Sequence, residues 1–282
     1  MKLMTRLAKS FVAGETVSEA LPRVKKMYDD GLTTTLDILG ESVEEREQSD
    51  KSVQAYMDLL DGIHKSGIPT HVSLKLTQMG LDIDDEYCYE NMVKIVSKAK
   101  SYGIFVRFDM EGSPHTQRTL DIFYRIKEQF DNVGIVLQAM LHRTDEDIIN
   151  LNKVKAKVRL CKGAYKEPVE IAYKKMKDIR EAFKQQTIAL FRDGVYPAIA
   201  THDDKLINWT KEYVRENNIS NENFEFQFLY GIRVKTWHKL VAEGYIVRVY
   251  VPFGTHWMPY YFRRLRERKE NVWFVIKNFF KS

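Results

Sequence analysis

Residues 104–140, IFVRFDMEGSPHTQRTLDIFYRIKEQFDNVGIVLQAM, contain one strand–helix–strand unit. The apolar and β-branched runs at 104–110 and 134–140 are typical of buried strands. Between them, residues 116–130 carry apolar side chains at the three- and four-residue spacing of an amphipathic helix. Two strands joined through a helix run parallel in one sheet, so this unit predicts an α/β fold.

The same alternation extends along the chain in both directions. Further strands are predicted at 33–39, 71–76, 157–161, 196–201, 224–228 and 246–251, and further helices at 43–65, 87–102, 169–193 and 205–217. About eight strand–helix units result, the number that closes a (β/α)8 barrel; an open doubly wound sheet is the structural alternative. We also expect an extra helix at 17–30 and a final helical region at 257–281.

The composition is that of a soluble globular protein. Of the 282 residues, 44% are hydrophobic and 29% charged, which excludes disorder and collagen-like repeats. Two cysteines, Cys88 and Cys161, are too few for a disulfide framework and favour a reducing cytosol. No apolar run approaches the roughly 18 residues that a membrane span needs, and residues 1–13 lack the apolar core of a signal peptide. Because no Pro-, Gly- or Ser-rich linker divides the chain, we expect residues 1–282 to form one domain.

Common cofactor and metal motifs are absent from the sequence. It contains no G-x-G-x-x-G, no G-x-x-x-x-G-K-[ST] and no H-E-x-x-H. A nucleotide cofactor would therefore need a site other than the usual glycine-rich loops, and we expect no metal centre. The net charge of +5 is a mild bias that identifies no partner.

Polar side chains recur where the predicted strands end. In a (β/α)8 barrel, catalytic residues lie at these carboxyl ends, and charges inside buried strands are costly unless paired. The residues are Lys75, Asp109, Glu111, Gln138, Arg159, Lys162, Thr201, His202, Asp203, Glu225, Gln227 and Tyr250. Each one alone fits an ion pair or a loop cap, and Arg159 with Asp109 would make a structural pair across the barrel. Taken jointly, they predict a shared pocket.

Residues 162–168, KGAYKEP, follow a predicted strand and are expected to open a long helix. Gly163 and Ala164 would let a ligand approach the backbone closely, and the helix N-terminus would favour an anion such as phosphate. A glycine at such a turn also occurs for conformational reasons alone.

The segment 250–268, YVPFGTHWMPYYFRRLRER, concentrates aromatic and basic residues. If the chain is helical from Tyr260, then Arg263, Arg264 and Glu267 share a face with it. Two arginines can grip a small carboxylate through paired hydrogen bonds, and Glu267 can hold a guanidinium in place. The alternative is a solvated basic helix end, which suits the later basic residues better.

Seven stretches together resemble the proline dehydrogenases, flavin-dependent enzymes of proline catabolism, and most closely the monofunctional bacterial type. They are SLKLTQMG, RFDMEGS, IVLQAMLHRTDED, VRLCKGAYKEP, ATHD, FEFQFLYGI and YVPFGTHWMPYYFRRLRERKEN, in order over nearly the whole chain. The resemblance implies a distorted (β/α)8 TIM-type barrel that forms a single catalytic domain, with the extra N-terminal helix and a C-terminal helix over the barrel mouth.

The resemblance also implies an activity. Non-covalently bound FAD would oxidise L-proline to Δ1-pyrroline-5-carboxylate by hydride transfer from C5 to flavin N5, as the first step of proline degradation to glutamate. Electrons would pass to a membrane quinone, and the product to a separate pyrroline-5-carboxylate dehydrogenase. The expected location is the cytoplasm, with room for peripheral contact at the inner face of the cell membrane.

Site residues carry over by matching motif. Catalytic roles fall on Asp109 and Arg159. Substrate binding falls on Lys75, Leu229, Tyr250, Tyr260, Arg263, Arg264 and Glu267, and FAD binding on Met110, Gln138, Arg159, Cys161, Lys162, Gly163, Ala164, Thr201, His202 and Gln227. Cys161 stands where the family often has valine, which a backbone contact to the cofactor would tolerate.

Two other functions compete with this hypothesis. An aldolase-like barrel would use Lys75 or Lys162 as a Schiff-base nucleophile, and it would be colourless. A basic nucleic-acid-binding protein is disfavoured, because the lysines and arginines are scattered and no recognised binding motif occurs.

Replacing Arg263 or Arg264 by Met should weaken proline binding far more than FAD binding. Each substitution removes a charge-assisted contact worth about 1.5–3 kcal/mol, so the apparent affinity for proline should fall about tenfold or more. Steady-state kinetics over a range of proline concentrations measure the effect. A normal Michaelis constant in both variants would mean that this helix face is solvated surface.

Overall fold

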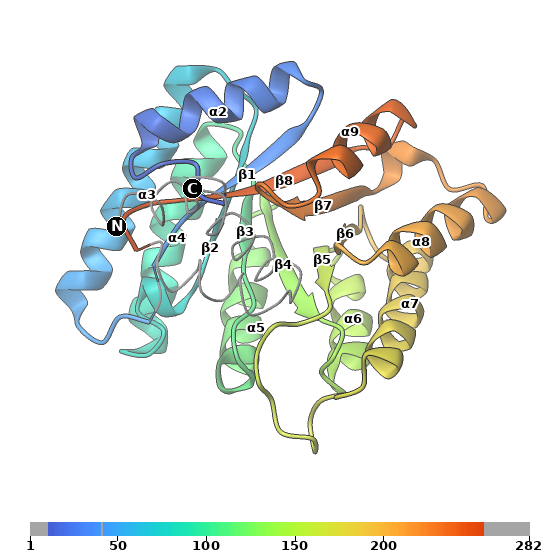
Figure 1. The fold of residues 1–282 in the computed structure, drawn as a ribbon. Helices are drawn as coiled ribbons and strands as arrows, with labels where there is room; N and C mark the ends of the chain where they lie inside the picture. Colours follow the sequence, from blue (N-terminus) through green and yellow to red (C-terminus); the bar gives the residue numbers. More distant parts are fainter. Residues whose placement is uncertain (1–10, 41, 257–282) are drawn as a thin grey trace, which may run out of the picture.

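The structure, a computed structural model, describes residues 11–40 and 42–256, in which parallel strands close into a barrel surrounded by helices (Figure 1). The strands are β1 (Thr33–Ile38), β2 (His71–Leu74), β3 (Val106–Phe108), β4 (Val133–Gln138), β5 (Lys157–Cys161), β6 (Ala198–Ala200), β7 (Glu225–Leu229) and β8 (Val247–Phe253). Each strand pairs with the next, and β1 pairs with β8 from Thr33–Arg248 to Ile38–Phe253. This last pairing closes the barrel and excludes the open doubly wound sheet.

Helices follow most of the strands. They are α2 (Val17–Asp29), α3 (Arg46–Ser66), α4 (Asp85–Ser101), α5 (Ser113–Lys127), α6 (Thr144–Lys153), α7 (Met176–Asp193), α8 (Asp204–Glu216) and α9 (Val234–Ala242), with short 3-10 turns η1 (Thr77–Met79) and η2 (Asn221–Asn223). Local signals set several ends: Asp84 caps α4 by accepting from the Tyr87 N–H at 2.8 Å, and Gly67 ends α3 with φ of 66°. None of the helices in the described ranges is long and apolar enough to cross a bilayer.

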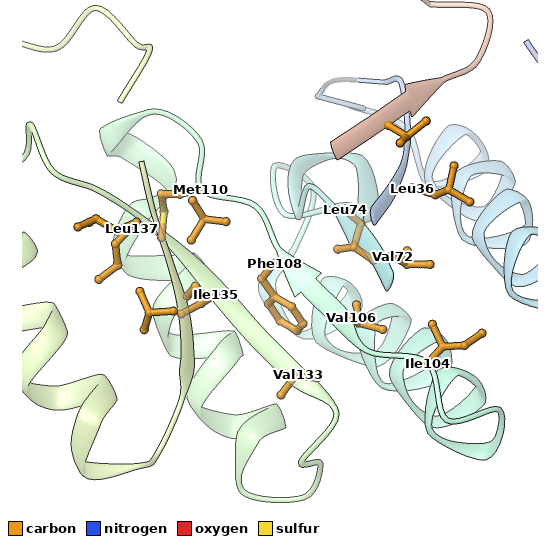
Figure 2. Packing of buried hydrophobic residues seen from close by; sticks show 14 of the residues in the cluster. Leu36, Val72, Leu74, Ile104, Val106, Phe108, Met110, Val133, Ile135 and Leu137 are labelled. Atoms are coloured by element: carbon orange, nitrogen blue, oxygen red, sulfur yellow. The ribbon is translucent and has the colours of Figure 1, made fainter. Parts of the chain in front are cut away.

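Strand alternation gives the barrel an apolar outside and a polar inside. Phe108 of β3 points outward, and its ring meets Phe123 of α5 edge-to-face at 5.4 Å. Figure 2 shows part of the outer cluster, with Val72, Phe108 and Ile135 among side chains from neighbouring strands. The alternate residues, such as Arg107 and Asp109 of the same strand segment, face the barrel axis. The period of two therefore separates the core from the polar interior.

The extra N-terminal helix is confirmed and closes a seam of the barrel. Helix α2 packs against α3, β1 and β8, and buries Ala20, Val24 and Met27 there. Thr16 caps this helix, and Glu19 reaches back to the Glu15 N–H at 2.8 Å. Thus α2 covers the β8–β1 seam, where a regular barrel would use the helix that follows its last strand. The final helical region expected at 257–281 lies outside the described residues.

One helix boundary was predicted wrongly. Helix α7 begins at Met176 rather than 169, so residues 162–168 do not open it. The intervening segment is held extended by residues 140–142: His142 N–H donates to the Ile171 carbonyl at 2.9 Å, and Tyr173 N–H to the Met140 carbonyl at 2.8 Å. These bonds occupy backbone groups that a helix would need. The helix N-terminus proposed beside Gly163 is therefore not there.

The amino-terminal end of the barrel is sealed by buried charges. Glu225 begins β7 and accepts from Arg248 Nε at 2.9 and 3.1 Å, while Arg248 Nη1 donates to the Thr34 carbonyl at 2.7 Å. Glu225 also accepts from Tyr196 at 3.3 Å. The placement of Glu225 among the carboxyl-end residues was wrong, because it starts its strand instead of ending it. Burial alone would raise the pKa of Glu225, but Arg248 and its other donors outweigh burial and lower it.

Glu225→Gln should destabilise the fold by about 3–5 kcal/mol, because it leaves the Arg248 guanidinium buried without a counter-charge. The lowered pKa of Glu225 means that its stabilisation is present at pH 7 and is lost only as the pH falls below the ordinary glutamate value of about 4.3. Urea unfolding at pH 7 measures the loss. Glu222→Gln, three residues earlier on an exposed turn, is the matched control and should change little. Equal stability of the two variants would contradict a sealing role.

Candidate active site

A pocket of about 860 Å³ opens at the carboxyl ends of the strands. Of the polar residues expected in a shared pocket, Glu111, which accepts from Thr77 Oγ1 at 2.7 Å, and Glu225 do not line it. The pocket does take in every residue within the described ranges to which the family resemblance assigns a role. These are Lys75, Asp109, Met110, Gln138, Arg159, Cys161, Lys162, Gly163, Ala164, Thr201, His202, Gln227, Leu229 and Tyr250. Tyr260, Arg263, Arg264 and Glu267 lie outside the described residues. Sequence reasoning thus identified side chains that the fold brings together, and their individual roles stay predictions.

Asp109 is the central acceptor of the pocket. Its Oδ1 accepts from Arg159 Nη1 at 2.9 Å and from Ser73 Oγ at 2.5 Å, and its Oδ2 accepts from the Tyr250 hydroxyl at 2.8 Å. These donors come from β5, β2 and β8, so one carboxylate ties three strands together. Burial first, and then the nearby carboxylates of Asp109 and Asp37, raise the pKa of Tyr250 well above its usual value. The phenol therefore stays protonated and donates a hydrogen bond to Asp109.

Arg159 is buried and only partly paired. Apart from its bonds to Asp109 and Ser73, its Nε and Nη2 find no acceptor among the described residues. Its guanidinium carbon lies 5.3 Å from the centre of the Tyr250 ring. A buried N–H without an acceptor costs roughly 1–3 kcal/mol. A ligand with acceptor atoms next to Arg159 would remove that cost.

The adjoining wall combines close backbone approach with oriented polar groups. Gly163 has φ of 103°, and a Cβ placed there would lie 2.6 Å from the Met140 side chain, so this position requires glycine. Gln138 Nε2 donates to the Glu111 carbonyl at 2.9 Å, which orients its amide. His202 Nε2 accepts from the Leu229 N–H at 3.0 Å, so the neutral ring carries its proton on Nδ1.

One rim of the pocket is cationic. Asp203 Oδ2 holds Arg180 Nε at 2.8 Å and Lys162 Nζ at 3.3 Å, while Arg233 pairs with Asp204. Lys205 also lines the pocket. Burial alone would raise the pKa of Asp203, but Arg180 and Lys162 outweigh burial and lower it, so it stays ionised. Four cations against two carboxylates leave an excess of positive charge that suits an anionic group such as a diphosphate.

Sequence reasoning missed several lining residues. Arg180 stands in the first turns of α7, and it was hidden because the helix was expected to begin at 169. Arg233 directly follows the recognised stretch FEFQFLYGI and adopts a left-handed φ of 61° as it leads into α9. Asp37 was missed although a lone charge within the apolar run TTTLDIL was a usable signal. In the structure Asp37 pairs with Lys75 behind the pocket wall.

No group of His, Cys, Asp or Glu side chains in ranges 11–40 and 42–256 has the arrangement of a metal site. The pocket instead combines the carboxylate of Asp109, which three side chains contact, with the guanidinium of Arg159, two of whose nitrogens lack acceptors among the described residues. A wall that contains Gly163 and a cationic rim complete it. This set can bind an anionic organic cofactor next to a small substrate. Among the described lining residues, Lys75 and Lys162 are held as cations by ion pairs with Asp37 and Asp203, which does not favour an amine nucleophile.

Comparison with known proteins gives a consistent result. A protein-family model described as proline dehydrogenase matches residues 20–277. Proline dehydrogenase 2 of Bacillus subtilis (strain 168) is 40% identical over 275 residues, covering 98% of this chain and 91% of the relative. The proline dehydrogenase of Deinococcus radiodurans is 35% identical over 284 residues, covering 99% and 92%.

A solved structure has the same fold as this chain. The crystal structure of proline utilization A (PutA) from Bdellovibrio bacteriovorus, inactivated by N-propargylglycine, superposes with a TM-score of 0.89 at 28% identity. The match covers 94% of this chain but 33% of that protein, so the chain spans about a third of its length. The similarity therefore concerns one part of a larger protein.

Proposed function

Because the chain belongs to the proline dehydrogenase family, we propose that it is an FAD-dependent enzyme that oxidises L-proline to Δ1-pyrroline-5-carboxylate. The family is one of oxidoreductases that act on the CH–NH group of proline, in the first step of proline catabolism. The proposal takes residues 1–282 as one catalytic unit whose product passes to a separate pyrroline-5-carboxylate dehydrogenase. The observation that best supports a bound cofactor is the buried guanidinium of Arg159, whose Nε and Nη2 lack acceptors among the described residues.

The pocket residues fit a flavin dinucleotide. Gly163, with its left-handed φ, and Ala164 would let the isoalloxazine approach the backbone, while Arg159 would donate to its acceptor atoms. The excess cations at the rim, including Arg180 and Arg233, would hold the diphosphate. Bound there, FAD would supply the capacity to accept two electrons from a carbon–nitrogen bond, which no protein side chain provides.

Substrate binding falls to the inner wall. Lys75 presents an ammonium for the carboxylate of proline, and Leu229 presents apolar surface to the pyrrolidine ring. Arg263 and Arg264 remain the proposed partners of Lys75 in gripping the carboxylate. Fixing the small substrate at both its carboxylate and its ring orients the carbon that reacts and excludes water from it.

Asp109 acts in this proposal by positioning its neighbours rather than as a base. Its oxygens already accept from Ser73, Arg159 and Tyr250, so the carboxylate has little capacity left for a substrate proton. It fixes the guanidinium of Arg159 and the phenol of Tyr250 at the pocket wall. Asp109→Asn would replace an acceptor by a donor and disturb both.

The purified protein should be yellow, and anaerobic L-proline should bleach its flavin absorbance. Heat or acid should release FAD into the supernatant, because no covalent bond is proposed. Arg159→Met should retain less FAD than the parent protein, since the guanidinium contact is lost. Visible spectra before and after proline, with D-proline as the control ligand, measure these effects.

Two outcomes would contradict this function. If the purified protein is colourless and cannot be reconstituted with FAD, the proposal that it uses this cofactor is wrong. A borohydride-trapped substrate adduct on Lys75 or Lys162 would indicate lysine-imine chemistry instead.

We further propose that the electron acceptor is a membrane quinone and that the segment between β5 and α7 contacts the bilayer. Three large apolar side chains of this segment are exposed, Val169, Ile171 and Tyr173, and so is Met176, the first residue of α7. Lysines 166, 174, 175 and 177 are exposed among them. In Figure 1 the segment extends away from the barrel, and Met176 also lines the pocket. Exposed apolar residues interleaved with lysines suit an anionic lipid surface.

The double substitution Val169→Gln with Ile171→Gln should reduce sedimentation with vesicles of phosphatidylglycerol and phosphatidylcholine several-fold, because it removes apolar groups that would enter the interface. Binding should also fall with added salt and be weak to phosphatidylcholine alone. Val195→Gln, an exposed apolar residue beyond the far end of α7, is the matched control and should bind like the parent. Equal sedimentation of parent and double variant would rule out this segment as the contact.

A further inference from the structure

Asp37 is a buried carboxyl that does not line the pocket. Its side chain is 1% exposed, on β1, and both of its oxygens lie 3.3 Å from Lys75 Nζ. The Lys75 side chain is 14% exposed and does line the pocket. The ammonium thus stands between a carboxylate behind the wall and the open volume in front of it.

The carboxyl of Asp37 is itself held in place from outside the barrel. The Tyr56 hydroxyl, from α3, lies 3.4 Å from Asp37 Oδ1 and 3.0 Å from the Ser73 carbonyl, and it accepts from the Ile38 N–H at 3.2 Å. Tyr56 is fully buried. A buried side chain of α3 therefore contacts the Asp37 carboxyl on the side away from the pocket.

The charge on Lys75 depends on its carboxylate neighbours. Burial alone would lower the pKa of Lys75, but Asp37, then Asp109 and Glu111, outweigh burial and raise it above the ordinary lysine value. Tyr165 contributes weakly in the same direction. Asp37 is the one neighbour within residues 11–40 and 42–256 in ion-pair contact with Lys75, so it raises the pKa of Lys75 most.

We propose that Asp37 is a positioning residue that keeps Lys75 charged and fixed at the pocket wall, ready for an anionic ligand group. Without Asp37, the burial of Lys75 is offset only by the more distant carboxylates of Asp109 and Glu111, so its amine loses its proton more readily and holds a carboxylate less well. The consequence for proline rests on the proposed function; the charge state of Lys75 does not.

The pH window follows from Asp37 itself. Burial raises the pKa of Asp37 to about 6; Lys75 partly offsets this effect, and the nearby carboxylate of Asp109 adds to it. The pair is therefore fully ionised above about pH 7, and protonation of Asp37 below about 6 dissolves it. The charge state of Lys75 is therefore measured between pH 7 and 11, where Asp37 is ionised.

The test is competitive acetylation of the whole protein with trace acetic anhydride over that range, read by mass spectrometry of the Lys75 peptide. Only the neutral amine reacts, so the midpoint of rate against pH reports the pKa independently of access. Exposed Lys26 is the internal reference. In the parent protein the Lys75 midpoint should lie above that of Lys26. In Asp37→Asn it should fall below it, and the neutral fraction at pH 8 should rise about tenfold for each pH unit by which the midpoint falls.

Two further variants make the result specific. Thr35→Val changes a buried hydroxyl on the same strand and face, with no partner in the described residues, and should leave the Lys75 midpoint unchanged. Asp37→Glu keeps the charge and should hold the midpoint above that of Lys26. A parent midpoint below that of Lys26 would overturn the proposal even if Asp37→Asn failed to fold, and so would an unchanged midpoint in folded Asp37→Asn.

Proline kinetics separate this inference from the proposed function. In Asp37→Asn the Michaelis constant for proline should rise more steeply between pH 7 and 9 than in the parent, with a smaller change in kcat. If the midpoint moves as expected but the parent does not oxidise proline, the proposed function fails and the role of Asp37 stands. If the parent oxidises proline and the midpoint does not move, the role of Asp37 alone fails.

Discussion

The ion pair between Arg159 and Asp109 is the constraint on which the carboxyl end of this barrel depends. It joins β5 to β3 across the interior at 2.9 Å, and Ser73 and Tyr250 add β2 and β8 to the same carboxylate. A charge inside a barrel is expensive unless it is paired. The interior can therefore be polar because its buried charges find partners on other strands. These are counter-charges for Arg159 and Arg248, and the backbone carbonyls of Ile135 and Lys157 for Arg107. The nitrogens that Arg159 leaves unpaired are available to a ligand.

Buried charge serves different purposes at the two ends of the barrel. At the amino end, both oxygens of Glu225 accept from Arg248 Nε and the pair is buried, so its effect is on stability. At the carboxyl end, Lys75 is paired on one side only, and Arg159 keeps two nitrogens without acceptors among the described residues. Incomplete pairing costs stability and leaves the pocket ready to bind. Polar residues on the inner face of the strands thus seal the amino end of the barrel and form the binding pocket at its carboxyl end.

The failures of prediction are as informative as the successes. The strands were identified because apolar runs such as 104–110 and 134–140 follow a period that local sequence expresses directly. The start of α7 was misplaced because residues 171–173 bond to residues 140–142, a contact between segments thirty residues apart. That error hid Arg180, whose place at the pocket rim follows from where the helix begins. Asp37 was overlooked because it does not end its strand, and its proposed role depends on an ion pair with Lys75, which follows the neighbouring strand β2.

The sequence by itself determined the order of strands and helices, the family, and most of the polar residues that end the strands, because these are properties of short stretches and of their spacing. The sequence also anticipated the pair of Arg159 with Asp109, but only the tertiary structure decided the other charge pairs. Glu225 and Gln227 stand two residues apart, yet closure of β8 onto β1 and β7 assigns one to the seal with Arg248 and the other to the pocket. Pairing depends on distances across the barrel, and those distances exist only once the eight strands have closed.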